Sequence, residues 1–230
     1  MREFLQNFSL FPLVLTLLTY EIGVFINKKW KSPLTTPLLI AVLATIGVLL
    51  LTGYPSDRYQ ASMEHFQWIL TPATVCLAVP LYQQMKVLKK SLPAILIGVA
   101  AGTITAMGSV LLLCKCFSLS REVTVPLLTK SVTTAIGLAL TEQNDGLTAL
   151  APVGTFLTGM TGCVLGFLLC KVFRLKKPEA QGVAFGTAAH VIGTSKVSEK
   201  GDLQAAVASL SLTISGVLTA ILFPFVVKLI

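Results

Sequence analysis

The stretch TKSVTTAIG, residues 129–137, places a lysine, a serine and three threonines within nine positions. Apolar runs lie on both sides of it, VLLLC at 110–114 and LTALAPVGTFLTGM at 147–160. An ionisable group inside a bilayer costs at least about 2.5–3.5 kcal/mol on insertion scales, so it usually has a partner or a function. The fold class depends on how the chain accommodates this segment.

The composition is that of a polytopic membrane protein. Of the 230 residues, 54% are hydrophobic and only 12% are charged, whereas soluble domains carry about 25% charged residues. The mean hydropathy is +0.80. One crossing of a bilayer needs about 20 apolar residues. Runs of about this length or longer occupy residues 8–26, 34–52, 66–85, 93–114, 147–173 and 203–229.

The basic residues predict the orientation of the chain. Its net charge of +8 does not indicate nucleic-acid binding, because the lysines and arginines cluster at the ends of apolar runs. NKKWK (27–31), KVLKK (86–90) and RLKK (174–177) are typical of cytoplasmic loops under the positive-inside rule. We therefore expect a retained first helix with the N-terminus outside, and no nucleic-acid partner.

Two segments do not fit simple crossings. With the orientation above, residues 115–146 must begin and end on the same side, yet two crossings need about 40 residues. Residues 178–202, which contain GVAFGTAAHVIGTSK, must also return to the side on which they start. Non-helical backbone inside a bilayer is tolerated only within protein or beside a water-filled cavity. The sequence therefore predicts a broken or re-entrant helix in each segment.

An internal repeat links these two segments. A shift of 56 positions aligns 98–137 with 154–193 without gaps, with ten identities in 40 positions. The predicted orientation makes the two units antiparallel, and paired inverted units with interrupted helices are typical of secondary transporters. We therefore expect TKSVTTAIG and GTAAHVIGT (186–194) to form two halves of one site. The identities fall at Gly98, Thr105, Leu112, Leu113, Cys114, Lys115, Phe117, Leu119, Ile136 and Gly137.

The expected fold is an all-α integral membrane protein with about six transmembrane helices, two re-entrant or broken helices and a candidate inverted repeat of the transporter type. The whole chain, 1–230, is expected to form a single polytopic membrane domain. Its expected parts are the N-terminal helices (1–92), repeat unit one (93–145), repeat unit two (146–202) and the final helix (203–230).

Lys130 is the first candidate site residue. It would anchor an anionic substrate, together with nearby hydroxyls and the backbone N–H groups of a half-helix N-terminus. The alternative is a lysine that snorkels to the interface or pairs with Glu122 or Glu142. The row of hydroxyls beside it favours the anchor. These hydroxyls belong to Ser131, Thr133 and Thr134.

His190 is the second candidate. It would donate to a carboxylate or carry a proton, since the reference pKa of histidine is about 6.5. Gly186 and Gly193 would permit close approach of the backbone, and Thr187 and Thr194 would add hydroxyls. A structural histidine that hydrogen-bonds a neighbouring helix is the open alternative.

The sequence gives no indication of an enzyme. It contains no GxSxG, HExxH or Walker motif. Two histidines and ten acidic residues offer no plausible catalytic set. The five cysteines are odd in number and lack metal-ligand spacing. We expect no catalytic activity, no metal and no cofactor.

Five motifs resemble those of the LrgB/CidB family of membrane proteins, which includes bacterial antiholin-like proteins and plastid glycolate/glycerate translocators. Where the family has PKSVTTPIA, this chain has Thr129 and Ala135, so its helix break is softer or depends on Pro126. Where the family has GTASHAIGTA, it has Ala189 and Ser195. The motifs span nearly the whole chain: TTPLLIA (35–41), LTPATVCLAVPLYQQ (70–84), TKSVTTAIGLAL (129–140), GVAFGTAAHVIGTSKVSE (182–199) and ASLSLTISGVLTAILFPF (208–225).

The resemblance implies one of two functions in the bacterial plasma membrane. One is transport of small monocarboxylates of the pyruvate, glycolate or glycerate class. The other is holin/antiholin-like modulation of murein hydrolase activity and cell lysis, together with an LrgA/CidA-type partner. The lysine and hydroxyls favour the transporter, which would work by alternating access. Faces of small residues also leave a homo-oligomer open.

Overall fold

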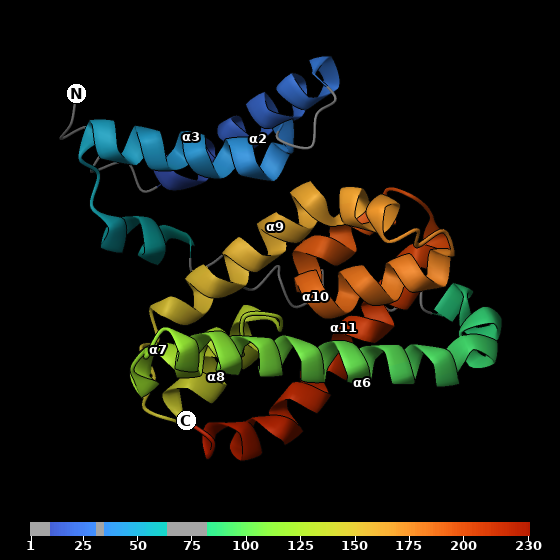
Figure 1. Ribbon diagram of the computed structural model, residues 1–230. Helices are drawn as coiled ribbons and strands as arrows, with labels where there is room; N and C mark the ends of the chain where they lie inside the picture. Colours follow the sequence, from blue (N-terminus) through green and yellow to red (C-terminus); the bar gives the residue numbers. More distant parts are fainter. Residues whose placement is uncertain (1–9, 31–34, 64–81) are drawn as a thin grey trace. The chain divides into compact units, whose positions relative to one another are not determined.

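The computed structural model describes residues 10–30, 35–63 and 82–230, and this part of the chain contains helices and no strands (Figure 1). The chain divides into two compact units, Met1–Cys76 and Leu77–Ile230, each of which is described by itself. Helices α2, α6, α9 and α11 are long and apolar enough to cross a membrane. The prediction of an all-α membrane protein is confirmed.

The first unit contains α2 (Phe11–Lys29), α3 (Pro37–Thr52) and a short helix at 56–63. The two long helices match the predicted spans 8–26 and 34–52. They approach closely, because a Cβ on Gly23 would lie 2.6 Å from the carbonyl oxygen of Pro37. A hydrogen bond of 2.9 Å joins the buried hydroxyls of Thr19 and Thr45. The predicted span 66–85 lies mainly outside the described residues.

Three long helices form the frame of the second unit. They are α6 (Met85–Cys116), α9 (Leu150–Val172) and α11 (Asp202–Val227). Helix α6 contains the predicted span 93–114, and α9 and α11 cover most of the predicted spans 147–173 and 203–229. Helices α6 and α9 run in opposite directions (Figure 1). One apolar cluster joins α6 to α11, with Ile95, Val99 and Val207 almost fully buried.

The segment after α6 is a helical hairpin made of α7 (Arg121–Leu128) and α8 (Thr134–Glu142). The N–H of Leu147 donates to the carbonyl of Glu122 at 2.9 Å, so the hairpin begins and ends at the same place. The break follows Pro126, whose carbonyl accepts from the N–H of Thr129 at 3.2 Å and from its hydroxyl at 2.8 Å. The predicted chain reversal is confirmed, and Pro126 lies beside the break.

Helix α10 (Pro178–Ser198) is broken at Ala189 (φ −126°, ψ 16°) and His190 (φ 42°, ψ −138°). In a straight helix, residues eight apart are separated by about 12 Å. Here a Cβ on Gly193 would lie 2.9 Å from the carbonyl oxygen of Phe185, so the two halves fold against each other. Gln181 and Lys200 line the same cavity, which places both ends of α10 together. The second predicted reversal is also confirmed.

The backbone repeats at the predicted spacing of 56 residues. Ser118 (φ 51°) and Arg174 (φ 54°) both adopt left-handed conformations just after α6 and α9. Each turn is closed by an equivalent hydrogen bond. The N–H of Leu119 donates to the carbonyl of Cys114 (2.9 Å), and the N–H of Leu175 donates to the carbonyl of Cys170 (2.8 Å). Non-glycine residues are uncommon at positive φ, so this coincidence supports a structural repeat.

Contacts between the two repeat units are reciprocal. A Cβ on Gly98 would lie 3.2 Å from Val183 Cγ1, and one on Gly154 would lie 3.8 Å from Leu127 Cδ2. The repeat spacing of 56 relates the two contacts, because Gly98 corresponds to Gly154 and Val183 corresponds to Leu127. Because α6 and α9 run in opposite directions, the repeat is inverted. The limits 93–145 and 146–202, and the single-domain organisation, stay predictions.

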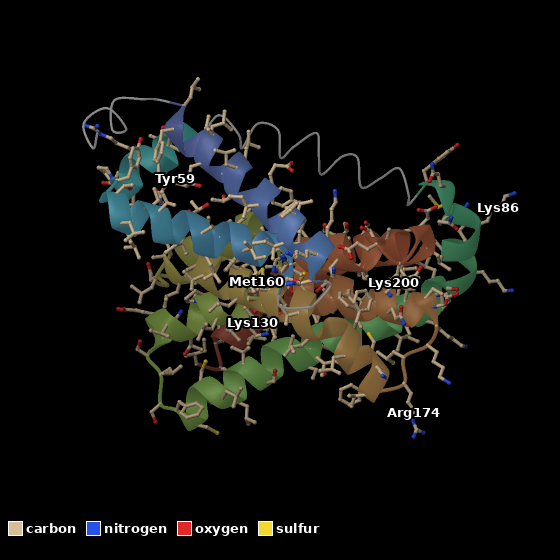
Figure 2. All side chains as sticks on the ribbon, turned by 90° about the horizontal axis from the view of Figure 1, so that it is seen from above. Tyr59, Lys86, Lys130, Met160, Arg174 and Lys200 are labelled. Carbon is tan, nitrogen blue, oxygen red and sulfur yellow. The ribbon has the colours of Figure 1, made fainter. Side chains whose placement is uncertain are left out.

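Two basic segments of the second unit lie together. Lys90 and Lys177 line one cavity of about 540 Å³, so KVLKK and RLKK lie at the same end, here named the basic end. Figure 2 shows Lys86, Arg174 and Lys200 at this end. The first hairpin begins and ends at the opposite end, near Glu122. This arrangement agrees with the side that the positive-inside rule predicts for both basic segments.

Cysteine labelling tests the first hairpin. In a variant without native cysteines, Ser118→Cys and Asp145→Cys should react with a membrane-impermeant maleimide from the same face. Lys177→Cys, at the basic end, should react only from the other face. Labelling of intact and permeabilised cells measures this, and reaction of positions 118 and 145 from opposite faces would refute the reversal.

A glycine substitution tests the packing of α10 on α11. In Gly186→Ala, the new Cβ would overlap the carbonyl group of Ala208, and such overpacking costs about 1–3 kcal/mol. Gly108→Ala is the matched control, since nothing lies within 4 Å of its Cβ position and alanine favours helix by up to about 1 kcal/mol. The unfolding temperature in detergent should therefore fall for Gly186→Ala and should not fall for Gly108→Ala. Equal unfolding temperatures would contradict this contact.

Candidate functional site

One turn of α9 contacts the tips of both hairpins. A Cβ on Gly154 would lie 3.7 Å from Lys130 Cβ, in the first hairpin. The carbonyl of the next residue, Thr155, lies 2.8 Å from Nε2 of His190, at the break of the second. The two segments that the sequence pairs as halves of one site therefore meet on successive residues of α9.

Lys130 lies in the turn between α7 and α8, away from the basic end (Figure 2). Its Nζ donates to Ser131 Oγ at 3.4 Å, and its side chain is partly buried. In residues 82–230 the ion pair that forms is Lys196–Glu199, so neither Glu122 nor Glu142 neutralises Lys130. The pairing alternative is not observed, and the ammonium has a hydroxyl as its side-chain neighbour.

The N-terminus of α8 lies directly beside Lys130. Thr133 is the N-cap residue, with an extended backbone, and its side chain makes no capping hydrogen bond. The first N–H groups of a helix lack intrahelical partners and carry a partial positive charge. Ser131 is buried, Thr133 is half-buried and Thr134 is exposed. The tip therefore combines an ammonium, hydroxyls and a helix N-terminus without a side-chain cap.

His190 is 3% exposed and contacts α9 as the structural alternative expects. Since a carbonyl only accepts, Nε2 donates to Thr155, and in the neutral ring Nδ1 is then an acceptor. The ring donates to a carboxylate only when both nitrogens carry protons. The hydrogen bond to α9 and a proton-carrying role are therefore compatible, and the role stays a prediction.

Both predicted glycines permit close approach, and the approaching groups belong to this chain. The position of a Cβ on Gly186 is filled by backbone atoms of Ala208 in α11, and that of Gly193 by Ala189 and Phe185. The hydroxyl of Thr194 donates to the carbonyl of His190 at 2.8 Å. These three residues shape the broken helix, whereas Thr187 has a different environment.

Two buried hydroxyls in residues 82–230, those of Thr187 and Ser211, have no hydrogen-bond partner among the residues that the structure describes. They are 4% and 0% exposed. Leaving a buried polar group unpaired costs about 1–3 kcal/mol. Neighbouring hydroxyls are satisfied, since Ser209 donates to the carbonyl of Ala205 and Ser215 bonds Thr103 at 3.0 Å. Among the buried hydroxyls of this region, the two unpaired groups are therefore exceptions.

The packing of α10 on α11 advances along both helices from Gly182 to Gly186. Gly182 packs against Gln204 and Val207, and Gly186 packs against Ala208. Continued by one further turn, this register would bring the break at Ala189 and His190 level with Ser211. Thr187 faces α6, since a Cβ on Gly102 of that helix would lie 2.9 Å from Thr187 Cγ2.

Ser211 is absent from the residues predicted as the site. The signal was four hydroxyls at alternate positions of an apolar run, 209 to 215. Ser209 and Thr213 bond their own helix, as helical serines and threonines often do. The spacing of four residues puts Ser211 on the same face as Ser215, which bonds α6. Periodicity alone would therefore have grouped Ser211 with Ser215, apart from Ser209 and Thr213.

Comparison with known proteins agrees with the motifs. The sequence model of the LrgB-like family matches residues 16–229. The chain belongs to the LrgB-like family. Antiholin-like protein LrgB of Bacillus subtilis (strain 168) is 34% identical over 221 residues, which cover 96% of each chain. Antiholin-like protein LrgB of Bacillus mycoides (strain KBAB4) is 34% identical over 215 residues, 93% of this chain and 94% of the relative. No solved structure matches.

Membership of the LrgB-like family confirms the resemblance predicted from the sequence. The matched region covers both hairpins and α11, and therefore the whole candidate site. A family of antiholin-like membrane proteins is not an enzyme family. The finer statement, that this chain catalyses no reaction, stays a prediction.

The unpaired hydroxyl of Ser211 gives a stability test. Ser211→Ala removes a buried polar group without breaking a hydrogen bond, so the free energy of unfolding should rise, by about 1 kcal/mol. Ser215→Ala is the matched control on the same face and should destabilise the protein, because it leaves Thr103 unpaired. Thermal unfolding in detergent without added ligand measures both. Equal destabilisation by the two substitutions would show that Ser211 has a partner in the free protein.

Proposed function

We propose that this chain is a transporter of small monocarboxylates, of the pyruvate, glycolate or glycerate class, that works by alternating access. The observation that carries the proposal is the convergence of Lys130 and His190 on successive residues of α9. Among the residues that the structure describes, the ammonium has no carboxylate partner and two hydroxyls are unpaired, and these groups lie on the elements that meet there.

The chemistry of these groups suits a small hydroxy or keto acid. Lys130 supplies a positive charge for the carboxylate, and Ser131 and the N–H groups of α8 supply donors. Half-helix N-termini that point at anionic groups are typical of transporter sites. The hydroxyls of Thr187 and Ser211 would bind the second oxygen function of the substrate, which would supply the hydrogen bonds that they lack.

We assign the other predicted residues supporting roles. Thr133 and Thr134 lie at the start of α8, where their N–H groups and hydroxyls would line the path to Lys130. His190 holds the break against α9 and, when doubly protonated, would add a second positive charge. Gly186, Gly193 and Thr194 would keep the broken helix folded against α11 and against itself.

The hairpins offer a mechanism for alternating access. They enter from opposite ends, with their tips at the same turn of α9, so movement of either hairpin would open the site to one side. We infer a location in the bacterial plasma membrane, with the N-terminus outside and the basic end in the cytoplasm. A homo-oligomer or a small LrgA/CidA-type partner would complete the assembly in the cell.

The second candidate is an antiholin-like regulator of murein hydrolase activity and cell lysis. The names of the curated relatives favour it, since both are antiholin-like proteins. Such a protein would act by assembly with a partner and would not need to bind a solute. An ammonium and unpaired hydroxyls at converging helix breaks have no evident use in that mechanism.

Uptake into proteoliposomes separates the two functions. Purified protein should transport labelled pyruvate or glycolate with saturable kinetics. Lys130→Ala should lower uptake at least about tenfold, because hydrogen bonds to charged groups contribute about 1.5–3 kcal/mol. Ser211→Ala should also lower uptake. Lys115→Ala, an exposed lysine outside the site, is the control and should leave uptake unchanged.

His190 needs two variants because its backbone has a positive φ. His190→Ala removes the ring and keeps the Cβ, so the positive φ stays as unfavourable as in the wild type, whereas His190→Gly removes the ring and also relieves that strain. Both should reduce uptake if the ring is required. Leakage of unrelated dyes that depends on their size and is indifferent to Lys130 and His190 would overturn the transporter in favour of a pore.

A further inference from the structure

A second concentration of charge lies at the basic end, separate from the candidate site. A cavity of about 470 Å³ between α9 and α10, here named the cationic pocket, has four basic side chains in its lining and no acidic one. Neither Lys130 nor His190 lines it. Its basic residues are Lys171, Arg174, Lys176 and Lys200.

These cations have no carboxylate partners. In the part of the chain that the structure describes, none of the four forms an ion pair, and the nearby Glu199 is bound to Lys196 at 2.6 Å. Like charges gathered around one cavity repel each other, so an anion placed among them would be stabilised by several favourable interactions at once.

Part of the pocket is fixed by other contacts. The ammonium of Lys200 lies 5.1 Å from the centre of the Phe167 ring, a cation–π arrangement. Phe167 packs in turn on Phe185, with ring centres 4.8 Å apart. The side-chain amide of Gln181 donates to the carbonyl of Leu175 at 2.9 Å. The walls are therefore held before any ligand binds.

The inverted repeat supplies an internal comparison. The same left-handed turn is built by Ser118 in one unit and by Arg174 in the other. At the repeat-related positions of Lys176 and Lys200, repeat unit one has Ser120 and Asn144. The turn does not require these charges to fold. Their presence in one unit alone indicates a role beyond the backbone.

An apolar groove adjoins the cationic pocket. It has a volume of about 210 Å³, and Cys170 and Leu175 line both spaces. The groove continues along α9 and α10 past Gly166 and Phe173 to Ala188 and Ala189. A cationic space that opens into an apolar groove matches a ligand with an anionic head and a hydrocarbon tail.

We propose that the cationic pocket and this groove bind one anionic phospholipid, with its phosphate among the four cations and an acyl chain along α9 and α10. Basic pockets between transmembrane helices at the cytoplasmic side are suited to anionic head groups. The occupied groove would end beside Ala189, at the helix break. Bound lipid would therefore stabilise the second hairpin in the conformation described here.

The test uses the full-length protein in detergent. Dioleoyl phosphatidylglycerol should raise the unfolding temperature in a saturable manner and should remain bound in native mass spectrometry, whereas dioleoyl phosphatidylcholine should do neither. Inorganic phosphate and glycerol phosphate are the arms that carry the anion without a tail. A shift from either of them equal to that from the lipid would overturn the proposal in favour of a soluble anion site.

Two variants separate the head from the tail. Arg174→Ser with Lys176→Ser introduces the residues of the other repeat unit and should weaken phosphatidylglycerol binding about 10- to 30-fold. Ala188→Leu fills the groove at an exposed position and should also weaken it. Lys115→Ser, at the repeat-related position of Lys171, is the control and should bind normally. Wild-type affinity in the double variant would overturn the proposal.

Discussion

The fold depends on one constraint, that backbone polar groups inside a bilayer must find partners within the protein. Two helix breaks in an apolar chain are permitted only where other helices cover them. Here α9 covers both, because the carbonyl of Thr155 holds the ring of His190 and Gly154 lies against Lys130. The polar residues that look misplaced in the sequence are thereby removed from lipid.

Close packing and function are connected through the same helices. Glycines at 159, 162 and 166 of α9 leave space for His190, Ala189 and Phe185, so the second hairpin lies directly against that helix. The opposite side of the hairpin is fixed by Gly186 against α11. A hairpin held so closely on two sides has few arrangements available. The geometry of its tip is therefore set by backbone contacts and not by long side chains.

Much of this arrangement could be predicted from the sequence. Charge at the ends of apolar runs was sufficient to show that 115–146 and 178–202 reverse direction, because chain length excludes two crossings. The repeat then paired the segment that contains Lys130 with the segment that contains His190. The sequence could not show that Gly186 and Gly193 are filled by this chain's own backbone, or that Ser211 lacks a partner, since both depend on the register between helices distant in sequence.

The reciprocal contacts of the inverted repeat are unequal. A Cβ on Gly98 would lie 3.2 Å from Val183 Cγ1 and one on Gly154 would lie 3.8 Å from Leu127 Cδ2, although the repeat makes the two positions equivalent. Two related halves can be arranged asymmetrically in two ways. Either the contact at Gly98 or the contact at Gly154 is the closer one. The second arrangement needs no new contacts, because each pair of residues adopts the spacing of its counterpart. In the alternating-access mechanism proposed above, the duplication would supply both conformations from a single set of interactions.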